Sequence, residues 1–112
     1  MEQSKTTTFS VGQIWDDRHP PIFTLFPVKA ATEIKAGQVL KVGDDALTVE
    51  PATAEDASFI GVACEGVKAG SNVYVTVLIH GTVKTEKIAV GTDALTAEGA
   101  AKLRAAGVYT ID

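Results

Sequence analysis

The stretch from Phe59 to Ile88, FIGVACEGVKAGSNVYVTVLIHGTVKTEKI, decides the fold class of this chain. From Val73 to Ile79 apolar β-branched residues occupy every second position, a period of two that fits a strand and not a helix. The intervening positions include Tyr74 and Leu78, so we expect apolar neighbours on both faces and a central place in a barrel or sandwich. Gly81 interrupts the run, which predicts a bend or bulge before the strand resumes.

Shorter elements flank this central strand. Phe59 to Cys64 is apolar and β-branched and predicts a strand, which the turn-rich segment Glu65 to Ser71 joins to the central one. Upstream, Val39 to Val42 and Ala46 to Val49 predict the two arms of a hairpin. Gly43 lies in the turn between them and is expected to supply a positive φ there.

The C-terminal region changes from strand to helix periodicity. Thr96 is a suitable N-cap for a helix from Ala97 to Ala106, and Gly107 is a suitable stop. Gly99 inside the helix costs about 1 kcal/mol of helix propensity. A terminal strand, Val108 to Ile111, follows. The helix is expected to bury one face, formed by Ala100, Leu103 and Ala106.

Length and composition favour one mainly β domain of 112 residues. A net charge of −4, with ten scattered Lys and Arg, argues against a nucleic-acid partner, which requires a dense basic patch. The single cysteine, Cys64, excludes an internal disulfide and is interpreted as a small core hydrophobe. The N-terminus lacks the apolar core of a signal peptide and no run has the length of a membrane span, so we expect synthesis in a cytoplasm without export by that route.

The first twelve residues are polar and rich in threonine, and two interpretations fit them. They are a frayed terminus, or they are an arm that orders on a partner. The second interpretation depends on residues with the strand propensity needed to add to a sheet edge. These candidate arm residues are Thr6, Thr7, Thr8, Phe9 and Val11.

The next segment, Ile14 to Pro27, reads IWDDRHPPIFTLFP and concentrates aromatic residues and prolines. The prolines exclude a regular helix and limit any strand to an edge or to short pieces. In one interpretation Trp15, Phe23 and Phe26 close one end of the barrel. In the other they form a surface for self-association or docking, because aromatic residues in loops are effective interface anchors.

No catalytic motif is present in the sequence. The spacing of Asp16, Asp17, His19 and His80 matches no metal-binding pattern, so solvated turn residues are the simplest interpretation of this set. We therefore predict no catalytic residue, no metal and no cofactor, and a non-enzymatic protein that binds or assembles.

Three segments, in order, resemble the tailed-phage head decoration proteins of the lambda protein D type. They are AGQVLKV, then FIGVACEGV followed by VYVTVLIHGTVK, and then ALTAEGAAKLRAAGVYTI. The resemblance covers roughly Ala36 to Asp112 and fades before Val28. It implies a small β-clip or β-tulip-like barrel with one short C-terminal helix and a flexible N-terminal arm. The corresponding division is residues 1–27, arm and lead-in, and residues 28–112, the decoration domain.

The resemblance also implies a function. Members of this family form homotrimers that bind the outer surface of the expanded head at threefold positions and stabilise it against packaged DNA. Their N-terminal arm adds as a strand to the major capsid protein. Applied here, the arm is Thr6 to Val11, with Ile14 and Trp15 as apolar anchors at its base. The protein would be assembled in the bacterial cytoplasm and reside on the capsid exterior, without nucleic-acid or membrane partners.

Two alternatives from other classes remain open. The phrase ATEIKAGQVLKVGDD also resembles the start of SAF-type β-clip domains, which suggests a carbohydrate-binding or assembly-accessory module. A concave pocket with convergent polar groups would favour that alternative. The second is a small metal-dependent enzyme that uses Asp16, Asp17, His19 and His80.

Overall fold

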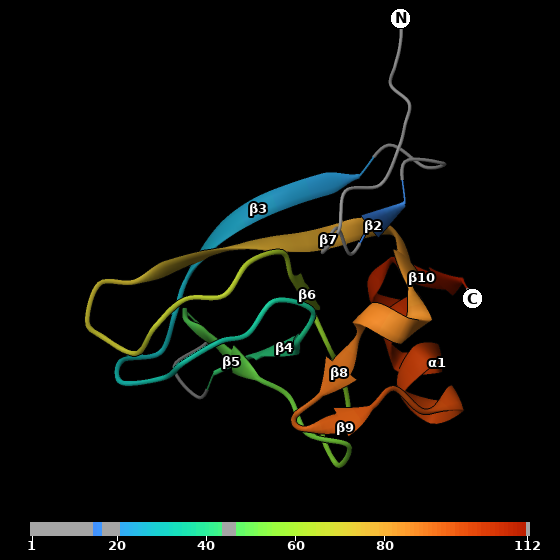
Figure 1. Ribbon diagram of the computed structural model, residues 1–112. Helices are drawn as coiled ribbons and strands as arrows, with labels where there is room; N and C mark the ends of the chain where they lie inside the picture. The colour runs from blue at the N-terminus through green and yellow to red at the C-terminus, as the bar shows by residue number, and fades with distance from the viewer. Residues whose placement is uncertain (1–14, 17–20, 44–46, 112) are drawn as a thin grey trace, which may run out of the picture.

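The computed structural model describes residues 15–16, 21–43 and 47–111, and Figure 1 shows the arrangement of their elements. One α-helix, α1 (Ala97–Ala106), and one 3₁₀ turn, η1 (Thr85–Lys87), accompany the described strands. The strands are β2 (Trp15–Asp16), β3 (Ile22–Pro27), β4 (Val39–Val42), β5 (Val49–Pro51), β6 (Gly61–Ala63), β7 (Tyr74–Lys84), β8 (Ala89–Val90), β9 (Asp93–Ala94) and β10 (Val108–Ile111). The fold is mainly β with one C-terminal helix, as the sequence predicted.

The strand predicted to be central, β7, pairs with four of the other described strands. Its first part pairs antiparallel with β3 and with β6, and its last part pairs antiparallel with β2 and parallel with β10. The partners change around Gly81, which has φ of +143°. Ile22 pairs with His80 while Phe23 pairs with Leu78, so one residue of β7 is bulged out. The predicted irregularity is confirmed, within one continuous strand.

Around Val77 and Leu78, β7 is buried on both faces because it separates two hydrophobic cores. One, here called the strand core, lies inside the curl of the sheet and comprises Val28, Ile34, Leu40, Val49, Ala63, Val75 and Val77. The other, here called the helix core, lies under α1 and comprises Val39, Ala52, Phe59, Val62, Leu78, Val83, Ile88, Val90, Leu103 and Val108. Alternation sends Val75 and Val77 into the strand core and Leu78 into the helix core, whereas Tyr74, on the same face as Leu78, is exposed.

The described strands do not close into a barrel, which corrects that part of the expectation. Their order is β10, β7, β6, β4, β5, with β2 and β3 also on β7. A single bridge between Val28 and Val49 brings the end of β3 back towards β5, around the strand core. This bridge connects the two ends of the curled sheet at one position, but β3 and β5 do not pair along their length.

α1 begins and ends where the sequence predicted. The Thr96 hydroxyl accepts a hydrogen bond from the Gly99 N–H at 3.1 Å, and Gly107 ends the helix with φ of +110°. The predicted buried face is partly wrong, because the buried helix residues are Gly99 and Leu103. A Cβ at Gly99 would lie 2.9 Å from Leu95 Cδ1, so this glycine gives Leu95 room to pack against the helix core.

β4 and β5 pair as the predicted hairpin, but the second strand begins at Val49, where the predicted arm ended. The reason proposed for the hairpin glycine is also wrong. Gly43 does not have a positive φ, unlike Gly37, Gly81, Gly91 and Gly107. A Cβ at Gly43 would lie 3.0 Å from the Thr48 hydroxyl oxygen. Space beside the opposite strand, and not backbone conformation, explains this glycine.

Replacement of Gly61 by alanine should destabilise the fold. Gly61 is buried in β6, and a Cβ there would clash with the Leu78 carbonyl oxygen and lie 2.9 Å from Val77 Cγ1. Both of these atoms belong to β7, so an alanine side chain could fit only if β6 and β7 moved apart. We therefore expect Gly61→Ala to lower the free energy of unfolding, measured by urea denaturation, by about 1–3 kcal/mol. The control is Gly66→Ala, where the nearest atom would be 3.4 Å away. Equal stability of the two variants would contradict this packing.

Candidate functional site

The proposed arm residues Thr6, Thr7, Thr8, Phe9 and Val11, and the anchor Ile14, lie outside the described residues. The second anchor, Trp15, begins β2, where it pairs with Val83 of β7. Asp16 pairs with Thr82 in the same ladder. The backbone at the base of the arm is therefore fixed on the last part of the central strand.

The two described phenylalanines of the aromatic lead-in, Phe23 and Phe26, fit different interpretations: one fits a surface residue and the other a core residue. Phe26 is half-buried and packs against the strand core, which fits the interpretation as a core residue although no barrel end is present. Phe23 is 40% exposed, which fits the surface interpretation. The difference follows from strand alternation, because these residues are three apart on β3 and point to opposite faces.

Three exposed side chains lie on one face of the β3–β7 ribbon. Phe23 pairs with Leu78, Leu25 with Thr76 and Pro27 with Tyr74, so residues at alternate positions share this face. Leu25 is 61% exposed and Tyr74 is 54% exposed. We call Phe23, Leu25 and Tyr74 the apolar strip. Of these three residues, only Phe23 belongs to the docking surface that the sequence predicted.

The ribbon that carries the strip lacks full charges. Residues 21–28 and 69–83 contain no Asp, Glu, Lys or Arg, although these make up 21% of the chain. Edge strands of soluble proteins usually carry charges that prevent association. The absence of charge was a readable signal in the sequence, and it identifies this edge as a candidate interaction surface.

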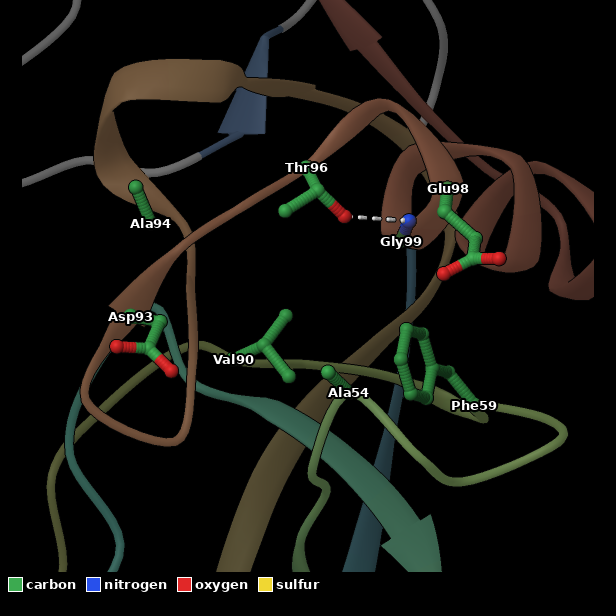
Figure 2. A pocket seen from close by; sticks show the side chains of 8 residues that line it. All are labelled: Ala54, Phe59, Val90, Asp93, Ala94, Thr96, Glu98 and Gly99. Atoms are coloured by element: carbon green, nitrogen blue, oxygen red, sulfur yellow. Dashed lines mark hydrogen bonds between the residues drawn. The ribbon is translucent and has the colours of Figure 1, made fainter.

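A separate cavity of about 190 Å³ lies between α1, the β8–β9 hairpin and the loop before β6. Figure 2 shows Phe59 and Val90 at its apolar side, with Asp93 and Glu98 near its rim. The Thr96 hydroxyl accepts the Gly99 N–H and thereby caps the helix. The described residues that line the cavity are Ala54, Phe59, Val90, Asp93, Ala94, Thr96, Glu98 and Gly99.

This cavity does not favour the carbohydrate-binding alternative. Its volume is below the roughly 300–1,000 Å³ of typical ligand pockets. None of its described lining residues is basic, so an acidic sugar would meet two carboxylates and no cation.

A polar cluster holds the loop that forms one wall of the cavity. Asp56 accepts hydrogen bonds from the Thr53 N–H at 2.7 Å and from Lys41 Nζ at 3.0 Å. Lys102 Nζ, from α1, donates to the carbonyl oxygens of Ala54 and Asp56. The Thr53 N–H, then Lys41, lower the pKa of Asp56 against the opposing effect of burial. The cluster joins the loop to β4 and α1.

Cys64 packs against the helix core, as predicted, and is half-buried. Burial, with the neighbouring Glu65 carboxylate, raises the pKa of the thiol to about 11. A thiol with this pKa is almost fully protonated near neutral pH and is a poor nucleophile. Its role is packing.

In the described part of the chain, no three His, Cys, Asp or Glu side chains lie close enough to hold a metal ion. Asp17 and His19 lie outside that part. His80 is exposed, and its ring meets the Tyr109 ring edge-on with centroids 6.4 Å apart. This aromatic contact gives His80 a packing role where β3, β7 and β10 meet.

A search of protein-family models and of curated proteins finds no match to this chain. No helix within the described ranges is long and apolar enough to cross a membrane.

Removal of the Asp56 carboxylate should loosen the loop. We expect Asp56→Ala to lower the free energy of unfolding at pH 7 by about 1–2 kcal/mol, because it leaves the Thr53 N–H and Lys41 without this acceptor. Since the folded-state pKa is lowered, the contribution is present above the unfolded pKa of about 3.9 and is lost as pH falls through the folded value. Urea denaturation at several pH values measures this. The neighbouring exposed Glu55→Ala is the control, and an equal loss there would contradict the cluster.

The Cys64 thiol should react slowly in the native protein. A pKa of about 11 reduces the thiolate fraction at pH 8 by roughly a hundredfold relative to an unperturbed thiol. We expect a disulfide reagent to label native protein at least this much more slowly than protein in denaturant, where the one cysteine reacts fully. Comparable rates in the two states would mean that the thiol is accessible and ionised.

Proposed function

We propose that this chain is a non-enzymatic structural protein that works by assembly. Within that class, we propose a tailed-phage head decoration protein of the lambda protein D type. It forms a homotrimer that binds the outer surface of the expanded head at threefold positions, and its N-terminal arm adds as a strand to the major capsid protein. The observation that carries the proposal is the pairing of Trp15 with Val83, which attaches the base of the arm to the strand that supports both cores.

The positions of the resembling segments support the proposal. AGQVLKV contains β4, FIGVACEGV contains β6, VYVTVLIHGTVK contains β7, and ALTAEGAAKLRAAGVYTI contains α1 and β10. All of these elements contribute to the helix core, through Val39, Val62, Leu78, Leu103 and Val108. The resemblance therefore covers one contiguous packing unit, and the region where it fades is the outer edge formed by β2 and β3.

The proposed mechanism is binding to the capsid protein through strand pairing, without a chemical reaction. Backbone groups of Thr6 to Val11 pair with a sheet edge of the capsid protein, and each hydrogen bond contributes roughly 1 kcal/mol net. Ordering the arm costs part of this energy, so one arm binds weakly. A trimer presents three linked arms, which raises avidity by roughly 10² to 10⁴ without a new kind of contact.

A force on a bound arm is transmitted to the core through β2. Trp15 and Asp16 pair with Val83 and Thr82, and Val83 is fully buried in the helix core. The two-residue pairing of β2 therefore attaches the base of the arm to a strand that is buried in the body of the protein. The proposed protein thus connects capsid subunits through its body and resides on the capsid exterior.

Loss of strand pairing by the arm should abolish decoration. We expect a Thr6→Pro/Thr8→Pro variant to bind undecorated expanded heads roughly a hundredfold more weakly, because proline removes backbone donors. The heads are assembled from the major capsid protein of the phage or prophage that carries this gene, and binding is measured by cosedimentation. The matched control is Thr6→Val/Thr8→Val, which keeps the donors and the strand propensity. Equal binding of the two variants, each with unchanged solution mass, would contradict the arm mechanism.

A further inference from the structure

The β3–β7 ribbon lacks features that usually keep an edge strand monomeric. In the described part of the chain, β3 pairs with no strand other than β7. Its six residues carry no charge, and Leu25 at its centre is the most exposed at 61%. Soluble proteins place lysines, inward-pointing charges or coverings at such edges. Among the described residues of this ribbon the exposed apolar strip has no such charge, which indicates a surface that is covered in the working assembly.

The strip suits side-chain packing better than extension of the sheet. Pro21 precedes β3 and Pro27 ends it, and proline donates no backbone hydrogen bond. A strand added to this edge would therefore have a short ladder. Phe23, Leu25 and Tyr74 instead project from one face, where they can interdigitate with a facing surface.

We propose that the apolar strip of Phe23, Leu25 and Tyr74 is the surface on which copies of this chain pack against one another around a threefold axis. The threefold symmetry rests on the proposed function, and the location of the contact rests on the structure. A second copy is the occupant that charge favours. The chain has a net charge of −4, so copies repel each other on average, and this uncharged ribbon can meet its own copies without opposing like charges.

This location separates the two interfaces of the proposed function. Tyr74 begins β7, whereas Trp15 pairs with Val83 near its other end. Nine residues of strand separate Tyr74 from Val83 by roughly 30 Å, and five residues separate Leu78, the partner of Phe23, from Val83 by roughly 16 Å. Figure 1 shows β2 and β10 beside the C-terminal end of β7, away from the N-terminal end of β7 where Tyr74 lies. Packing through the strip therefore leaves the arm available for the capsid protein.

The test is the solution mass of the full chain by light scattering, from high to low micromolar concentration. We expect the wild-type protein to have three times the subunit mass of 11.7 kDa. Leu25→Glu places like charges against one another at the contact and should weaken association by roughly a hundredfold or more. Tyr74→Ser, which removes contact area without adding charge, should weaken it in the same direction.

The matched control is Leu47→Glu. Leu47 is 75% exposed and lies outside the strip, so the change in charge and residue type is the same. We expect this variant to keep the trimer mass. Circular dichroism and the thermal midpoint confirm that each variant is folded, which is expected because both leucines are exposed.

Four outcomes would overturn the inference. These are a wild-type monomer at every concentration, a wild-type dimer, a Leu25→Glu variant that stays trimeric, and a Leu47→Glu variant that dissociates equally. Head binding separates this inference from the proposed function. A trimer that depends on the strip but does not bind heads supports the surface and contradicts the function. A wild-type monomer that binds heads, and loses binding with Leu25→Glu, overturns the inference because the strip then faces the capsid protein.

Discussion

β7 contributes buried side chains to both cores, and this is the constraint on which the other elements depend. Val75 and Val77 face the strand core, whereas Leu78 and Val83 face the helix core. Where β7 lies between the two cores both of its faces must be apolar, and its edges must be paired to satisfy the backbone. β6 and β3 satisfy the first part of β7, and β10 and β2 satisfy the last part. A change of register by one residue would exchange the two cores.

The change of partners along β7 takes place at two glycines. Gly81 and Gly107 both have positive φ, and the Gly81 N–H donates to the Gly107 carbonyl oxygen at 3.2 Å. A Cβ at Gly107 would lie 3.2 Å from His80 Nδ1 and from the Ile79 carbonyl oxygen. The two backbones approach closely at this junction, so the chain that leaves α1 can pair with β7 as the parallel strand β10. The same junction brings β2, and with it the base of the N-terminal segment, to the sheet.

Charged side chains are distributed unevenly over the elements. They stabilise the fold at one end of the molecule and are absent from the ribbon proposed to contact other copies. The Lys41, Asp56 and Lys102 cluster joins a loop to β4 and α1 at the helix end of the molecule. The β3–β7 ribbon, in contrast, contains no full charge from residue 21 to 28 or from 69 to 83. Charge pairs there would stabilise a single subunit, but they would also oppose contact between copies. The proposed assembly uses the uncharged side for other copies and the β2 end for the capsid protein.

The sequence by itself determined the elements whose signals lie within a few residues of one another. The period-two alternation identified β7, and Thr96 and Gly107 fixed both ends of α1, because capping and alternation depend on local backbone geometry. It identified the aromatic lead-in as a possible surface but could not separate Phe23 from Phe26. Only the tertiary structure decided that separation, the parallel pairing of β10, the burial of Gly99 and the curl that stops short of a barrel. These features depend on contacts between residues far apart in the chain, where packing space and the partner's register decide the outcome.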